Sequence, residues 1–107
     1  MGNDQRIIYK YRLQDGGVTV IKGWFTRVVH VGEQDGELMI WMENSLTKSD
    51  EQGNQIPRDE PKIEATIYVI GTGWPYSADI GKHIGTVQME NGLVWHVFIS
   101  DARWFNK

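Results

Sequence analysis

The residues best suited to bind a ligand surround a glycine-rich turn. Gly71, Thr72 and Gly73 directly follow an apolar run that ends at Ile70, so a predicted strand delivers the turn. Successive backbone amides in such a turn can bind an anion, and Thr72 adds a hydroxyl donor. The sequence lacks the lysine of a phosphate loop and the third glycine of a dinucleotide fingerprint. A plain tight turn is therefore the alternative interpretation.

Tryptophan is unusually frequent, with five in 107 residues. Trp41 and Trp95 lie in the middle of apolar runs and are expected in the core. The other three lie beside turns or near the end of the chain, close to basic residues. An aromatic ring beside a cation suits a planar base with a phosphate, or a protein interface in which Trp and Arg dominate. The predicted ligand-binding residues are Trp24, Arg27, Gly71, Thr72, Gly73, Trp74, Tyr76, His83, Arg103 and Trp104.

The histidines do not form a recognisable metal site. His30, His83 and His96 fall on separate predicted strands, and the chain has no cysteine to complete a zinc site. We therefore expect neither a metal nor a cofactor. His96 is expected to be a hydrogen-bonded imidazole in the core or in an interface.

No nucleophile is placed for catalysis. Gly-x-Ser-x-Gly is absent, and the nearest candidate, Ser77, follows Pro75-Tyr76 on a turn without a neighbouring histidine base. We therefore predict a protein that is not an enzyme.

Composition indicates one small globular domain spanning residues 1–107. The net charge of −3 has the wrong sign for a protein that neutralises many phosphates, so we expect no binding to duplex nucleic acid. Cysteine is absent, and no apolar run is long enough to span a bilayer. These features predict a cytoplasmic protein that is neither exported nor bound to a membrane.

Turn residues at short intervals separate runs of β-branched and aromatic residues. The pattern predicts an all-β fold, a small antiparallel sandwich or open barrel of about seven strands, with a short C-terminal turn or helix at 101–105. The predicted strands are 6–13, 18–21, 25–31, 37–43, 63–70, 84–89 and 93–99. The last two form a hairpin that turns on Asn91-Gly92, and a two-residue turn there would place Val87 opposite His96.

The segment 44–62 is polar and contains Gly53, Pro57 and Pro61. We predict a long mobile loop, since loops of this length are either functional lids or disordered. Trimming residues 45–60 is expected to leave folding intact.

Two predicted strands are apolar on both faces. In 93–99 the odd positions and the even positions both carry apolar residues, and the same holds for 37–43. An antiparallel sheet usually keeps one face polar. These strands must therefore be covered twice, by a second sheet, by the C-terminal tail or by another subunit, and we predict a homo-oligomer.

Several short blocks across most of the chain follow one known pattern. They are Tyr9-Lys10-Tyr11-Arg12-Leu13, Ile21-Lys22-Gly23, the 38–41 run, Ile70-Gly71-Thr72-Gly73 with Pro75, His83-Ile84-Gly85-Thr86-Val87-Gln88 and Leu93-Val94-Trp95-His96-Val97-Phe98. With these blocks the chain resembles a small uncharacterised family of bacteriophage proteins, known as a domain of unknown function. The resemblance implies a phage origin and a β fold. It supplies no catalytic residues, because the family has none assigned.

The functional prediction combines these observations with an analogy to other small phage proteins. We expect a phage-encoded, non-enzymatic protein that sequesters a nucleotide-type second messenger of bacterial immunity in pockets of a homo-oligomer. The alternative is an interaction module that inhibits a host protein through a tryptophan-rich surface. The two hypotheses differ in whether a small ligand stabilises the protein.

Overall fold

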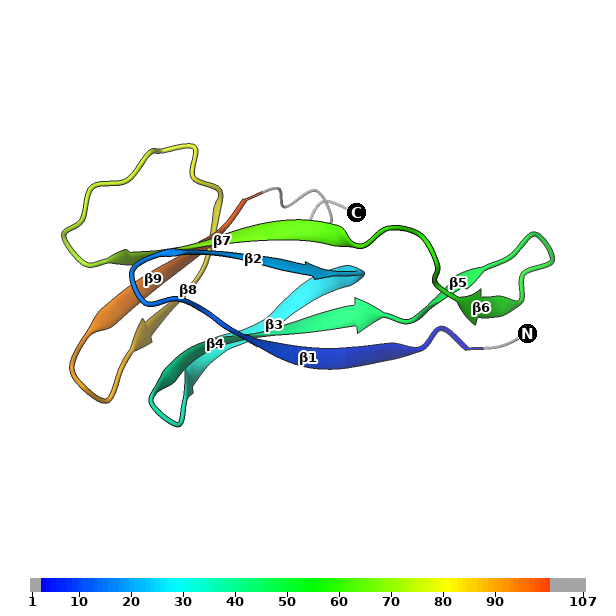
Figure 1. Ribbon diagram of the computed structural model, residues 1–107, viewed down its shortest axis with the longest axis horizontal. Coiled ribbons are helices and arrows are strands. Elements are labelled where there is room, and N and C mark those ends of the chain that lie inside the picture. Colours follow the sequence, from blue (N-terminus) through cyan, green and yellow to red (C-terminus); the bar gives the residue numbers. More distant parts are fainter. Residues whose placement is uncertain (1–2, 101–107) are drawn as a thin grey trace.

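The computed structural model describes residues 3–100 and confirms the all-β prediction, with no helix in that part of the chain (Figure 1). Its strands are β1 (Arg6–Arg12), β2 (Val18–Gly23), β3 (Phe25–Gln34), β4 (Glu37–Ser45), β5 (Thr47–Ser49), β6 (Gln55–Pro57), β7 (Ile63–Gly71), β8 (Lys82–Gln88) and β9 (Val94–Ile99). All seven predicted strands are present, and β5 and β6 are additional. The turn or helix predicted at 101–105 lies outside the described residues.

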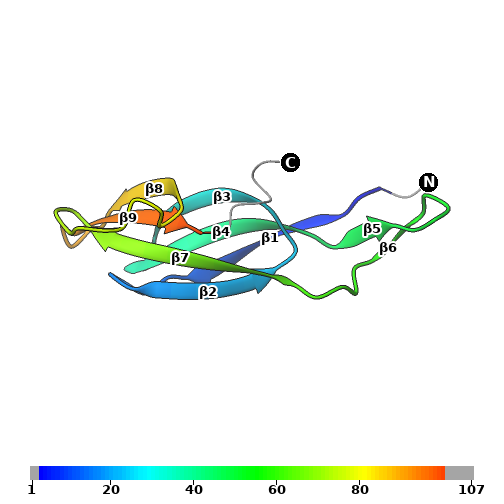
Figure 2. The same cartoon turned by 90° about the horizontal axis from the view of Figure 1, so that it is seen from above.

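Two antiparallel sheets form the layers of a small sandwich. One has three strands in the order β1-β4-β3, and the other has four in the order β2-β7-β9-β8. Figure 2 shows the two layers from above. The strand β3 of one layer lies against β8 of the other, which closes that side of the sandwich. On the opposite side, β1 and β2 are the edge strands.

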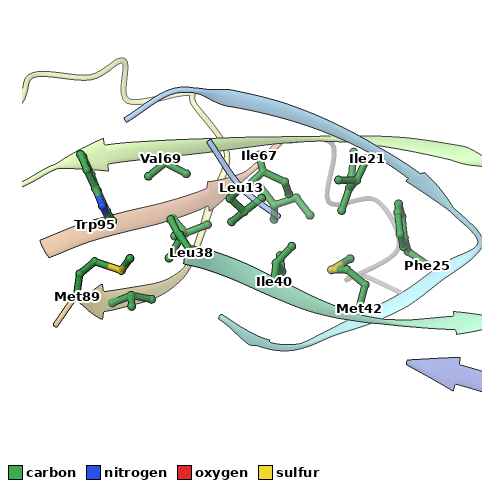
Figure 3. Packing of buried hydrophobic residues seen from close by; sticks show 14 residues of the cluster. Leu13, Ile21, Phe25, Leu38, Ile40, Met42, Ile67, Val69, Met89 and Trp95 are labelled. Carbon is green, nitrogen blue, oxygen red and sulfur yellow. The ribbon is translucent and has the colours of Figure 1, made fainter. Parts of the chain in front are cut away.

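The core lies between the two sheets and follows the alternation of the strands (Figure 3). On β4, Leu38, Ile40 and Met42 are fully buried. Successive side chains of a strand point to opposite faces, and these three lie on the face that points to the other sheet. From the facing sheet, β7 and β9 supply Ala65, Ile67, Val69, Trp95, Val97 and Ile99. Burial of each large apolar side chain stabilises the fold by about 1.5–3 kcal/mol.

The outward apolar face of β9 is covered by residues of the same chain. Phe98 is 7% exposed, and its ring lies 4.9 Å from that of Tyr76 and 5.2 Å from that of His83, between centroids. Tyr76 belongs to the segment 72–81, which joins β7 to β8 (Figure 1). This segment thus supplies part of the second cover, for which the sequence indicated a second sheet, the tail or another subunit.

The segment 44–62 is not the loop that its polar composition predicted. It contains the small hairpin of β5 and β6, in which Lys48 pairs with Ile56. The Asp50 carboxylate accepts hydrogen bonds from the amides of Gln52 and Asn54, and these bonds fix the turn. Side-chain hydrogen bonds to nearby backbone, rather than apolar alternation, therefore hold the hairpin.

The β8–β9 hairpin differs from its predicted register by one residue. Its loop has three residues rather than two, since the Met89 amide donates to the Leu93 carbonyl and Gly92 adopts a positive φ of 93°. Three-residue loops that end in such a residue are a common hairpin type. As a result Val87 pairs with Trp95, and Thr86 rather than Val87 lies opposite His96.

Candidate functional site

The candidate site is a hollow of about 360 Å³ on the outer face of the four-stranded sheet, at the ends of β7, β8 and β9. We call it the imidazole hollow. It is lined by Ile70, Gly71, Thr72, Gly73, Trp74, Tyr76, His83, Thr86, His96 and Phe98. The residues come from two neighbouring strands and from the segment that connects β7 to β8.

Strand geometry places the polar residues on one face. His96 and Phe98 alternate outward along β9, and they pair with Thr86 and His83 of β8. Residues 83 and 86 would point to opposite faces of a regular strand. A β-bulge between His83 and Gly85 shifts the register, so that both side chains reach the same face.

Four side chains in the hollow form one continuous relay. The Thr72 hydroxyl lies 2.7 Å from Nε2 of His96, whose Nδ1 lies 3.0 Å from the Thr86 hydroxyl. Thr86 in turn lies 3.0 Å from Nε2 of His83. Both nitrogens of His96 are therefore engaged, so this imidazole joins the two threonines and has no nitrogen left for a substrate.

With neutral imidazoles, the relay has two possible directions. In one, Thr72 donates to His96, His96 to Thr86, and Thr86 to Nε2 of His83, which leaves the N–H of His83 Nδ1 for a ligand. In the reverse direction, His83 donates to Thr86 and His96 donates to Thr72, whose hydroxyl is then left to donate. A hydrogen-bond acceptor of a ligand can thus bind at either end of the relay, and its position selects the direction in which the hydrogen bonds of the relay run.

The glycine-rich turn closes the hollow at the end of β7. The Trp74 amide donates to the Gly71 carbonyl at 3.1 Å, and Gly73 has a φ of 86°, a conformation that favours glycine. The closing bond engages the Trp74 amide, which lies outside the predicted cradle. The amides of Gly71, Thr72 and Gly73 stay the candidates to bind an anion.

Trp74 is held in place before any ligand binds. Its ring meets that of Trp95 edge-on, with centroids 5.6 Å apart. A Cβ atom at Gly71 or Gly16 would lie 2.7 Å or 2.8 Å from the indole, so both glycines are needed for this packing. Even so, Trp74 is 48% exposed, which leaves part of a fixed aromatic ring for a ligand.

The structure gathers six of the ten predicted site residues: Gly71, Thr72, Gly73, Trp74, Tyr76 and His83 line the hollow. Trp24 and Arg27 lie elsewhere. Trp24 donates from its indole to the Glu60 carbonyl at 3.1 Å, and Arg27 pairs with Glu43 at 3.2 Å on the three-stranded sheet. Arg103 and Trp104 lie outside the described residues.

Sequence reasoning left Ile70, Thr86, His96 and Phe98 out of the site. The relevant signal was present for His96 and Phe98, which alternate on one face of a strand. For Thr86 it was hidden, because the predicted register placed Val87 opposite His96. Only the correct pairing of β8 with β9 brings the hydroxyl to the imidazole.

The polar groups of the imidazole hollow are hydroxyls, imidazoles and backbone amides. Within residues 3–100, no lysine or arginine lines it, and no group of three His, Cys, Asp or Glu side chains could hold a metal ion. A ligand phosphate would meet amides, hydroxyls and imidazoles there.

Residues 3–100 contain no helix long and apolar enough to cross a membrane.

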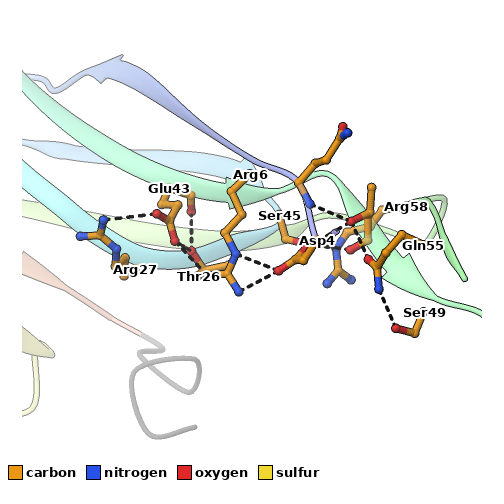
Figure 4. A network of polar contacts seen from close by, with 11 residues as sticks. Asp4, Arg6, Thr26, Arg27, Glu43, Ser45, Ser49, Gln55 and Arg58 are labelled. Atoms are coloured by element: carbon orange, nitrogen blue, oxygen red, sulfur yellow. Dashed lines mark hydrogen bonds and ion pairs between the residues drawn. The ribbon is translucent and has the colours of Figure 1, made fainter. Parts of the chain in front are cut away.

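A second polar cluster, on the three-stranded sheet, has a structural character (Figure 4). The Glu43 carboxylate accepts hydrogen bonds from Thr26 at 2.7 Å and Arg6 at 3.0 Å, and it pairs with Arg27. The hydrogen bond from the Thr26 hydroxyl, followed by that from Arg6, lowers the pKa of the Glu43 carboxyl below its ordinary value. Every charge in this group already has a partner, so the cluster offers no obvious site for a ligand.

Comparison with known proteins gives a family but no activity. A family model described as a domain of unknown function, DUF7352, matches residues 4–104. No curated protein and no solved structure is significantly similar to the chain. The expected resemblance is thus confirmed at the level of a domain of unknown function. Because the match covers nearly the whole sequence, the chain belongs to the DUF7352 family.

Proposed function

We propose that this protein is a binding protein for a small nucleotide-type ligand, which it holds in the imidazole hollow. One observation carries the proposal: the exposed rings of Trp74 and Tyr76 share a hollow with the four-residue relay that ends at Thr72 and His83. Aromatic rings bind planar bases by stacking, and the relay offers a donor or an acceptor at a defined place. Apolar walls with a few convergent polar groups are typical of small-molecule sites.

We propose sequestration rather than cleavage. Both nitrogens of His96 face threonine hydroxyls, and Nδ1 of His83 is the imidazole nitrogen of the relay that can still face a ligand. We assign that nitrogen the role of a hydrogen-bonding contact to the ligand. Ligand released by heating the complex is expected to be chemically intact on mass spectrometry, whereas an enzyme would return products.

The test of the binding site is a matched pair of threonine variants. Calorimetry and thermal shift would be run on ribonucleosides, their monophosphates, cyclic dinucleotides and ADP-ribose. We expect Thr86→Val to lower the affinity for the ligand about tenfold, because the substitution interrupts the relay. Thr66→Val is the control, since Thr66 also lies on the outer face of the four-stranded sheet but outside the hollow.

Two results would contradict the proposal. If no compound of the panel raised the melting temperature, the hollow would not be a nucleotide site. Equal losses for Thr86→Val and Thr66→Val would mean that the relay is not the contact. If the protein bound no compound of the panel but did bind a host protein, the result would favour the alternative of a tryptophan-rich interaction surface.

The proposed biological setting follows from the resemblance to phage proteins. We propose that the chain acts in the cytoplasm of an infected cell, where it lowers the free concentration of a nucleotide second messenger. Expression in bacteria that carry a nucleotide-signalled defence system is expected to raise the plating efficiency of sensitive phages. Loss of that effect in Thr86→Val, with no loss in Thr66→Val, would link it to the hollow.

A further inference from the structure

We propose that the imidazole hollow is one half of a two-part site for a dinucleotide-type ligand, with two planar rings joined by a phosphate bridge. The inference rests on the proposed function and names the ligand class. It starts from a second hollow of about 300 Å³ beside the first. This hairpin hollow is lined by Gly71, Thr72, Trp74, Gly92, Leu93, Val94 and Trp95.

The two hollows share one ridge. Gly71, Thr72 and Trp74 line both of them, so the glycine-rich turn lies between the two. The indole of Trp74 is fixed against Trp95 and contributes to each side. A ligand with a ring in each hollow would have its linking group over this turn.

The chemistry of the ridge suits a phosphate bridge. It carries the Thr72 hydroxyl and the turn amides that the closing bond of Trp74 leaves available. Oriented amides and a hydroxyl bind a singly charged phosphodiester without a neighbouring lysine. A hydroxyl donor also remains available when His96 donates to Thr72, which is one of the two directions of the relay.

Size favours a ligand that spans both hollows. Each hollow lies near the lower limit of ligand sites, about 300 Å³, which suits a single nucleoside. A second tethered ring binds at a high effective concentration and so raises affinity beyond that of either ring. A dinucleotide can use the full surface, whereas a mononucleotide leaves one hollow empty.

The two hollows differ in how selectively they can bind a base. At one end of the relay, Nδ1 of His83 gives the imidazole hollow a directional hydrogen bond, so this hollow can distinguish one base from another. The hairpin hollow has Leu93, which is 49% exposed, together with Val94 and Trp95. Its contacts are mainly apolar, and it should accept different bases.

The experiment compares mononucleotides with dinucleotides by calorimetry. The probes are the four ribonucleoside 5′-monophosphates and the four matching 3′,5′-linked homodinucleotides. For the preferred base, we expect the dinucleotide to bind the unmodified protein about tenfold more tightly. We expect Leu93→Ser to weaken dinucleotide binding about fivefold and to leave mononucleotide binding unchanged.

The controls separate this inference from the proposed function. Ile8→Ser removes an equally exposed apolar side chain, 50% exposed on β1 and outside both hollows, and should change neither affinity. Thr86→Val should weaken both ligands. Thermal melting confirms that each variant is folded, and Leu93→Ala serves as the second variant at that position.

Equal affinity for both ligand lengths would overturn the two-part site while the single-hollow proposal stood. The two-part site would also be overturned if Leu93→Ser weakened the binding of mononucleotide and dinucleotide by the same factor, or changed neither affinity. If no mononucleotide and no dinucleotide binds, the proposed function fails, and this inference fails with it.

Discussion

Glu43 shows how single residues stabilise the three-stranded sheet. Its side chain is 14% exposed and meets Thr26, Arg6 and Arg27. Because these contacts lower the pKa of its carboxyl in the folded state, they stabilise the fold above the unfolded pKa of about 4.3. This contribution is lost as the pH falls through the lower pKa of the folded state.

Glu43→Gln is therefore expected to destabilise the protein at pH 7 by about 1–2 kcal/mol, because a charged acceptor is lost. The gap between the variant and the unmodified protein should shrink as the pH is lowered below about 4. Urea unfolding at pH 7 and at pH 3 measures both values. The control is Glu64→Gln, since Glu64 is 64% exposed and pairs with Lys22. A gap of equal size at both pH values would contradict the role of the carboxylate charge.

At the scale of elements, the β5–β6 hairpin is attached to the sandwich at its base. Ser45 is buried, and its hydroxyl accepts from Nε of Arg58 at 3.0 Å. The Leu46 amide donates to the Gln5 carbonyl at 2.7 Å, and Trp24 bonds to the carbonyl of Glu60. The tip of the hairpin, residues 50–54, makes only local bonds.

Two trims of different length test this division. Replacing residues 50–54 with Asn-Gly should change the free energy of unfolding by no more than about 1 kcal/mol, because that dipeptide forms a tight hairpin turn. Replacing 45–60 with a short linker should cost about 3 kcal/mol or more, since it breaks the bonds at the base. The structure thus revises the expectation that the longer trim is harmless. Equal stability of the two proteins by urea unfolding would show that the base contacts contribute little.

At the scale of the whole molecule, the two open edges of the sandwich differ in their protection. The edge strand β1 carries Arg6, Lys10 and Arg12, whereas β2 carries two exposed valines and a single lysine. Charged side chains prevent edge strands from pairing with other chains. If the predicted homo-oligomer forms, β2 is the edge through which it should do so.

Light scattering is therefore expected to give a mass of more than one chain. Val20→Lys should lower that mass, because it adds a charge to the unprotected edge. Ile8→Lys on β1 is the matched control, because Ile8 is also exposed and its edge is already basic. A strict monomer at every concentration would refute the predicted homo-oligomer.

The sequence by itself determined the seven strands of the sandwich and the places where most of them turn. The alternation of side chains between the two faces of a strand depends on a few consecutive residues. The same holds for turns such as Asp35-Gly36, in which both residues have a positive φ. The glycine-rich turn after β7 was predictable for the same reason. The β5–β6 hairpin was not, because polar side-chain bonds hold it without an apolar pattern.

Only the tertiary structure decided which residues line the imidazole hollow. A three-residue loop and a β-bulge, each a change of one residue, bring Thr86 and His83 to the face of His96. The side-chain period of a strand is two, so a shift of one residue exchanges its faces. The placement of Trp24 and Arg27 away from the hollow likewise follows from packing between distant strands, which local sequence does not encode.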